Sequence, residues 1–173
     1  MKTDKLKYPI GKYNPGKISM DKLEEWIDGI EKFPSLLRKT VKGLNEKELL
    51  KTYRPEGWNI RQLVHHLADS HMNSFIRFKL ALTEDCPTIK PYEESNWATF
   101  PDANKQPIES SLLILEGLHS RWTTLLKNMS VTDFSKSFLH PEHKISTDLA
   151  STVGMYEWHG KHHLEHIKIA KKS

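Results

Sequence analysis

Cysteine is almost absent from this chain, since Cys86 is the single one among 173 residues. One cysteine cannot form an internal disulfide, which excludes the class of small secreted domains that disulfides hold together. No apolar run approaches the roughly 20 residues that a membrane-spanning helix needs. Residues 1–7 also lack the apolar core of a signal peptide. We therefore expect a cytoplasmic protein with no membrane-spanning helix.

A strong charge of one sign is absent too, because 26 Lys and Arg residues stand against 22 Asp and Glu residues, for a net charge of +4. The lysines are scattered, and no basic stripe interleaved with aromatic residues marks a nucleic-acid binder. We expect neither nucleic acid nor membrane as a partner. Repeats and Gly/Ser-rich linkers are also missing, so residues 1–173 are predicted to form a single domain.

Four long segments have apolar residues at helical spacing. The predicted helices cover residues 19–42, 60–83, 108–129 and 148–173, with Ser19, Asn59 and Thr147 as N-caps. Pro34 should kink or break the first of them near Phe33, because proline has no backbone N–H. A short helix is expected at 46–51, a helical turn at 131–134 and an extended segment at 138–141, but no sheet of any size.

Two stretches lack helical periodicity. Residues 1–18 carry turn signals around Pro9 and Pro15 and are predicted to form an extended arm. Residues 84–107 contain four prolines and are predicted to form a long irregular connection. Such a connection crosses between distant helices in bundles that are not simply up-down-up-down. The predicted fold class is therefore all-α: a four-helix bundle with a long crossover connection and an extended N-terminal arm.

Histidines gather in two of the predicted helices. His159 and His163 are four residues apart, which places both imidazoles on one face of a helix. Two rings cannot fill the coordination sphere of a metal ion, so a third ligand must come from elsewhere. His66 lies on the core-facing flank of the 60–83 helix, whereas His65 points away from the apolar stripe of that helix. The predicted metal site therefore consists of His66, His159 and His163.

Three neutral imidazoles with an open fourth position form a zinc site of the catalytic type. Nickel and iron also accept imidazole ligands. The segment is not the metalloprotease motif H-E-x-x-H, because Gly160 stands where that motif has its general-base glutamate. We expect one divalent metal ion per subunit, zinc before nickel, and assign no catalytic residue. The alternative is a histidine-rich helix that holds no metal, with two rings exposed and two bonded to carbonyls.

Other polar side chains near these histidines have two interpretations each. Asp69 could orient a ligand through a hydrogen bond, or it could be a solvated helix residue. His71 lies in the apolar stripe and is predicted to be a hydrogen-bonded core histidine. Arg61, Asn73 and Arg77 could line a polar mouth or make only helix-surface contacts, Glu157 and Glu165 are predicted surface charges, and His119, His140 and His143 form no usable arrangement.

Several motifs together resemble one known family. They are the segment from Gly57 to Asn73, the Tyr8-Pro9-Ile10-Gly11 turn, the segment from Ile76 to Lys79, the Arg121-Trp122 pair and Trp158-His159-x-x-His162-His163. Over essentially its whole length the chain is similar to the YfiT-type metal-dependent hydrolases of the DinB-like superfamily. The resemblance implies a dimeric, cytoplasmic four-helix bundle with zinc or nickel held by three histidines. By position these are His66, His159 and His163, the set that helix geometry also selects.

Three functions are compatible with the sequence. A metal-dependent hydrolase would activate water against a small-molecule substrate. A thiol S-transferase would use the same site to activate a low-molecular-weight thiol such as bacillithiol, as related DinB-like proteins do. A non-enzymatic bundle would store metal or use its histidines structurally. Fold does not fix function, so the hydrolase is the first expectation and the transferase the alternative.

Overall fold

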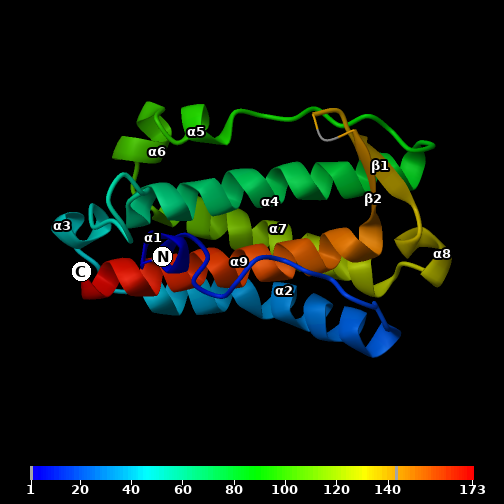
Figure 1. Ribbon diagram of the computed structural model, residues 1–173, viewed down its shortest axis with the longest axis horizontal. Coiled ribbons are helices and arrows are strands. Elements are labelled where there is room, and N and C mark those ends of the chain that lie inside the picture. Colours follow the sequence, from blue (N-terminus) through cyan, green and yellow to red (C-terminus); the bar gives the residue numbers. More distant parts are fainter. Residues whose placement is uncertain (1, 143) are drawn as a thin grey trace.

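Four long helices form the body of the protein, whose computed structural model describes residues 2–142 and 144–173. They are α2 (Met20–Val41), α4 (Ile60–Thr83), α7 (Glu109–Lys127) and α9 (Leu149–Lys172) (Figure 1). Both α2 and α4 pack against α7 and α9, so α2 and α4 lie diagonally across the bundle. The predicted four-helix bundle is confirmed.

Side-chain caps determine where three of these helices begin. The Ser19 hydroxyl caps α2, and Asn59 and Gln62 form a reciprocal capping box at the start of α4. Asp148, and not the predicted Thr147, caps α9 by accepting a hydrogen bond from the backbone N–H of Ser151 at 2.7 Å. Thr147 does not cap the helix because α9 begins at Leu149, which places Asp148 directly before its first residue. The caps of α4 and α9 set the turns from which the histidines project.

Short elements close the ends of the bundle. A capping box at Asn45 starts α3 (Glu46–Leu49), and α8 (Val131–Phe134) follows α7. The predicted extended segment near residue 138 is β1 (Ser137–His140), which pairs antiparallel with β2 (Ile145–Asp148) and leads into α9. This hairpin is the one sheet in the described part of the chain, and its second strand was not predicted from the sequence.

Two segments predicted to be irregular contain helices. The N-terminal arm, expected to be extended, starts with α1 (Lys2–Lys7), which is too short and too rich in lysine to show an apolar period. The crossover after α4 contains α5 (Glu94–Trp97) and α6 (Pro101–Lys105). Proline is accepted in the first turn of α6 because the first N–H groups of a helix have no partner within it. The crossover runs back along the bundle, so α4 and α7 point in the same direction (Figure 1).

Pro34 does not break α2, contrary to one expectation from the sequence. Because proline has no N–H, the carbonyl of Ile30 four residues earlier loses its partner within the helix. That oxygen instead accepts a hydrogen bond from Nδ1 of His119 on α7, at 2.6 Å. A buried side chain thus replaces the missing backbone donor.

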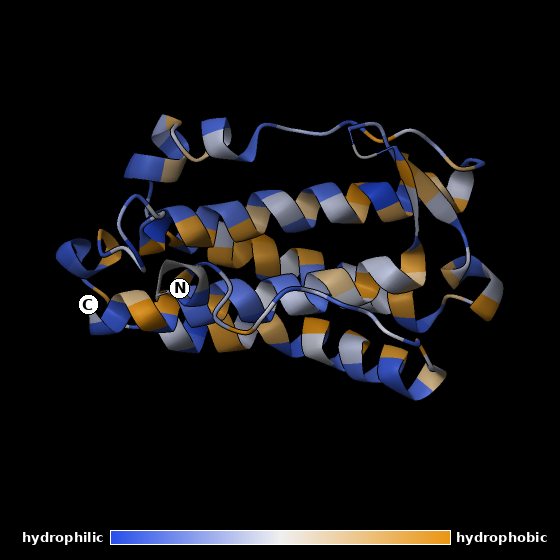
Figure 2. Cartoon of the chain, in the orientation of Figure 1, coloured by the Kyte–Doolittle hydropathy of each residue, from blue (hydrophilic) through white to orange (hydrophobic). Residues whose placement is uncertain are grey.

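Apolar and polar residues alternate along each of the four long helices (Figure 2). The buried apolar side chains form two clusters, one around Trp122 and Phe78 and one around Leu63 and Leu115. Between them lie the buried rings of His71 of α4 and His119 of α7, which contact Phe33 of one cluster and Trp122 of the other. The half-buried His159 and the buried His163 continue this histidine layer on α9. The core of the bundle is therefore divided by a polar layer.

Gly154 on α9 and Gly117 on α7 provide a matched test of this packing. A Cβ at position 154 would lie 2.7 Å from the Trp26 ring, whereas a Cβ at position 117 would meet nothing within 4 Å. We expect Gly154→Ala to lower the free energy of unfolding by about 1–3 kcal/mol through overpacking. Gly117→Ala should raise it by about 0.5–1 kcal/mol, since alanine favours a helix. Urea denaturation measures both values, and equal effects would contradict the close contact at Gly154.

Candidate metal centre

Three histidine side chains converge between α4 and α9. His66 projects from α4, while His159 and His163 project from successive turns of α9. The Nε2 atoms of His66 and His159 are 3.2 Å apart. One ring nitrogen from each of the three residues lies within 4.8 Å of the other two. The structure therefore brings together the three residues that the sequence selects.

This arrangement suits a metal ion. Three nitrogens bound at the usual zinc distance to a tetrahedral ion lie about 3.3 Å from one another, and the His66–His159 spacing of 3.2 Å agrees with that value. His66 and His163 are buried, and His159 is half-buried. Because three rings fill only three of the four positions of a tetrahedral ion, an ion among them would keep a position for a further small ligand.

Burial keeps the three rings neutral. Burial, with a smaller effect from the nearby His162, lowers the pKa of His66 to about 4. Burial is also the main reason why the pKa values of His159 and His163 lie well below the ordinary value, with neighbouring histidines as the second cause. A neutral imidazole has the free lone pair that a metal ligand needs at pH 7.

A second group of histidines shares one member with the first. His162, His163 and His166 also have one ring nitrogen each within 4.8 Å of the others. In this group, however, Nε2 of His166 lies 3.0 Å from the Leu6 carbonyl oxygen. Its Nδ1 lies 3.3 Å from Nδ1 of His163. Both nitrogens of His166 are thus engaged in hydrogen bonds, and the first group is the better candidate.

His159 also lines a cleft of about 370 Å³ beside the β1–β2 hairpin. Its walls are mostly apolar and include Phe138 and Met155. Arg77 and Glu94 bring opposite charges into the same cleft. Burial raises the pKa of the Glu94 carboxyl group, and the positive charge of Arg77 opposes this rise. The cleft therefore reaches the candidate site at His159, the one of the three ligands that lines it.

Of the three residues for which the sequence left two interpretations open, Arg77 lines the cleft, whereas Arg61 and Asn73 do not. Arg61 is buried and forms an ion pair with Glu46, far from the cleft. Asn73 donates a hydrogen bond to the carbonyl of Asp69 at 2.9 Å, a helix-surface contact. Asp69 is partly buried, which raises the pKa of its carboxyl group to about 6. In the described part of the chain, no hydrogen bond joins Asp69 to a candidate ligand.

The two glutamates of the histidine-rich helix differ. Glu165 forms an ion pair with Lys168 at 3.1 Å near the surface, as predicted. Glu157 was predicted to be a surface charge, but only 8% of it is exposed. Its side chain lies against Gly29 of α2, where a Cβ would be 2.8 Å from it, and its carboxylate pairs with Lys161. Gly29 allows this burial because it has no side chain, and the sequence pattern around Glu157 cannot show a contact with another helix. His143 lies outside the described residues.

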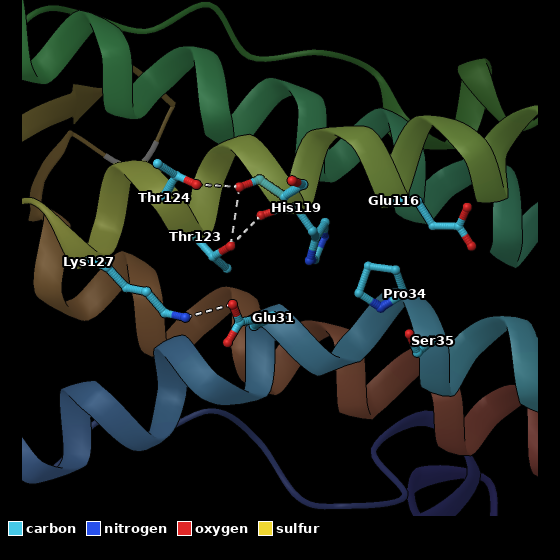
Figure 3. A pocket seen from close by; sticks show the side chains of 9 residues that line it. Glu31, Pro34, Ser35, Glu116, His119, Thr123, Thr124 and Lys127 are labelled. Atoms are coloured by element: carbon cyan, nitrogen blue, oxygen red, sulfur yellow. Dashed lines mark hydrogen bonds and ion pairs between the residues drawn. The ribbon is translucent and has the colours of Figure 1, made fainter.

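His71 and His119 extend the histidine cluster into the bundle. His71 is fully buried, as predicted, and its Nε2 lies 3.2 Å from Nδ1 of His159. Nδ1 of His71 lies 2.8 Å from Nε2 of His119, a residue that sequence reasoning left without a role. The ring of His119 points from α7 toward Pro34 of α2, beside a surface pocket of about 400 Å³ (Figure 3). In the sequence, Pro34 was the one sign of this role, because a proline inside a helix leaves a buried carbonyl oxygen that needs another hydrogen-bond donor.

The family is decided by comparison with known proteins. The chain matches the DinB superfamily over residues 30–167. It belongs to this superfamily. The resemblance predicted from the two histidine segments is therefore confirmed. In the part of this DinB superfamily member that the structure describes, no helix is both long and apolar enough to cross a membrane.

Close relatives agree with this membership. Proteins of Bacillus cereus (strain 03BB102) and Bacillus thuringiensis subsp. konkukian (strain 97-27), both named "Putative metal-dependent hydrolase", are 49% identical to it over 168 residues, 96% of each chain. YfiT from Bacillus subtilis, described as "a probable metal-dependent hydrolase with an unusual four-helix bundle topology", has a TM-score of 0.95 and 43% identity over 97% of both chains. A mycothiol-dependent maleylpyruvate isomerase has a TM-score of 0.66 at 16% identity, covering 84% of this chain and 60% of its own, and shares the fold.

Proposed function

We propose that this protein is a metal-dependent hydrolase whose ion is held by His66, His159 and His163. The observation that supports this most strongly is the convergence of three neutral ring nitrogens beside a cleft. When bound, a divalent ion lowers the pKa of a coordinated water toward about 7. We propose one ion per subunit, zinc before nickel, since imidazole suits both. The proposal includes a cytoplasmic homodimer, which the family resemblance implies.

The side chains of the cleft would bind and orient the substrate. Phe138 and Met155 provide an apolar wall that binds hydrocarbon and excludes water. Arg77 offers a positive charge to an anionic group of the substrate, and Glu94 beside it limits how much negative charge the cleft accepts. A small ester or amide with one acidic group fits this combination. The names of the 49% identical relatives support hydrolysis as the reaction.

A second candidate function is the transfer of a low-molecular-weight thiol such as bacillithiol. The thiol would lose its proton, its sulfur would form a bond to an electrophilic carbon, and the leaving group on that carbon would depart. Gly160 stands where the H-E-x-x-H motif has its general base, so a nucleophile with a lower pKa than water is an advantage here. The fold shared with a mycothiol-dependent enzyme also favours this candidate.

Metal reloading separates these functions. We expect chelator-treated protein to be inactive and zinc or nickel to restore the hydrolysis of an ester and amide panel in proportion to the metal bound. For the transferase, the same preparations would be incubated with bacillithiol and monochlorobimane, and the rate of adduct formation measured. The exposed Cys86 could itself react with the probe, so a Cys86→Ser background is needed. Adduct formation without ester hydrolysis would select the transferase, and a protein that binds no metal would contradict both.

A further inference from the structure

We infer that two chains of hydrogen-bonded histidines hold His159 and His163 in the tautomer that presents Nε2 to the metal ion. The first chain consists of His119 and His71, and the second of His166. This inference rests on the proposed metal site, but it concerns positioning residues outside that site. Its basis is which ring nitrogen of each histidine donates a hydrogen bond and which ring nitrogen accepts one.

The first chain starts at the carbonyl of Ile30, which can only accept. Nδ1 of His119, 2.6 Å away, must therefore carry the proton. In a neutral ring the other nitrogen is then an acceptor, so Nε2 of His119 receives the Nδ1–H of His71 at 2.8 Å. By the same rule Nε2 of His71 receives the Nδ1–H of His159 at 3.2 Å. Nε2 of His159 is left with a free lone pair, and it is this atom that lies 3.2 Å from Nε2 of His66.

The second chain starts at the carbonyl of Leu6, which also can only accept. Nε2 of His166, at 3.0 Å, therefore carries the proton. Its Nδ1 then accepts from the Nδ1–H of His163 at 3.3 Å. Nε2 of His163 is left with a free lone pair, as in His159. The two candidate ligands of α9 thus reach the same tautomer by separate routes.

Each chain starts at a carbonyl group that has no hydrogen-bond partner within its own helix. Pro34 removes the helical partner of the Ile30 carbonyl in the middle of α2. Leu6 lies in the last turn of α1, where carbonyl groups have no partner within the helix. A carbonyl at either place would otherwise be used by its own helix. The burial that lowers the pKa of His119 and of His166 to about 4 keeps both rings neutral.

Nuclear magnetic resonance of the metal-free protein tests the tautomers directly. Two-bond ¹H–¹⁵N correlation spectra of histidine-labelled protein distinguish Nδ1–H from Nε2–H rings. We expect His71, His119, His159 and His163 as Nδ1–H tautomers and His166 as the Nε2–H tautomer. A spectrum with His159 as the Nε2–H tautomer would overturn the inference. This result does not depend on whether the protein binds metal.

Substitution tests whether the first chain matters for metal binding. We expect His119→Phe to weaken zinc affinity by about 10- to 100-fold, the usual cost of losing a partner of a metal-binding histidine. His119→Gln, whose amide can both donate and accept, should recover part of it. His65→Phe is the control, because His65 is also buried but bonds to Ser111 and Gln106 outside both chains.

Competition with a chromophoric zinc chelator measures these affinities. An equal loss in His65→Phe and His119→Phe would show a general packing effect and contradict a positioning role. If His119→Phe fails to fold, the tautomer spectra of the wild-type protein still decide. Wild-type protein that binds no zinc would refute the proposed function, while zinc binding with the opposite His159 tautomer would refute only this inference.

Discussion

His66→Ala is expected to weaken zinc affinity by more than about 100-fold, which exceeds the cost of losing an outer hydrogen-bond partner. His162→Ala is expected to leave zinc affinity nearly unchanged. The reason is that His66 belongs only to the candidate ligand group shared with His159, whereas His162 belongs only to the group of His163 and His166. His66 is also the one candidate ligand contributed by α4, so no neighbour on that helix can replace it.

The two substitutions are well matched. The rings are buried to a similar extent, with 5% of His66 and 6% of His162 exposed, so each substitution removes a similar amount of packing. Both rings also contact a tryptophan, at centroid distances of 4.6 Å between His66 and Trp58 and 4.5 Å between His162 and Trp158. Zinc titration with circular dichroism as a folding check measures the difference. The reverse order of effects would place the metal in the second histidine group.

Much of the scaffold could be predicted because its signals are local. Apolar spacing identifies each long helix, and the caps at Ser19 and Asn59 fix two starting points to the residue. The His159 and His163 pair follows from the helical repeat alone. His66 follows from the flank of α4 that faces inward. These features depend on residues within a few turns of one another, which is the range that a sequence pattern can show.

The missed features depend on contacts between distant segments. His119 is 89 residues from the carbonyl that it binds, and 48 residues from His71. The burial of Glu157 depends on Gly29 of another helix. The role of α1 depends on the contact between its Leu6 carbonyl and His166, which is 160 residues away. A proline inside a long helix is nevertheless a usable sign, since it predicts that some buried donor must reach the freed carbonyl.

We expect the metal-free protein to be sensitive to acid, because eight of its histidines have a lowered pKa in the folded state. In the unfolded chain a histidine has a pKa near 6.5. In the folded chain burial lowers the pKa of His66 and of His119 to about 4, and it lowers those of six others, which are His65, His71, His159, His162, His163 and His166. Between these pH values the unfolded state binds more protons than the folded state. The free energy of unfolding must therefore fall as the pH falls from 6.5 to 4.

The size of this effect is large enough to unfold the protein. Each histidine that is protonated only in the unfolded state removes up to about 1.4 kcal/mol per pH unit. His66 and His119 together should remove about 4 kcal/mol between pH 7 and pH 5, a large part of the roughly 5–15 kcal/mol that stabilises a typical domain. Asp69 and Glu94 act in the opposite direction, because burial raises the pKa of both carboxyl groups, that of Asp69 to about 6. Two carboxyl groups cannot offset eight histidines.

Urea denaturation of the metal-free protein at several pH values gives the slope, and we expect cooperative unfolding above pH 4. Zinc-loaded protein should resist acid to a lower pH, because a bound metal must be displaced before its ligands accept protons. His119→Phe removes one titrating ring, so its free energy of unfolding should vary less with pH over the same range. A free energy of unfolding that stays constant between pH 7 and pH 5 would mean that these histidines are hydrated or already protonated in the folded state. In that case the rings of His66, His159 and His163 would not be the neutral ligands that the metal site requires.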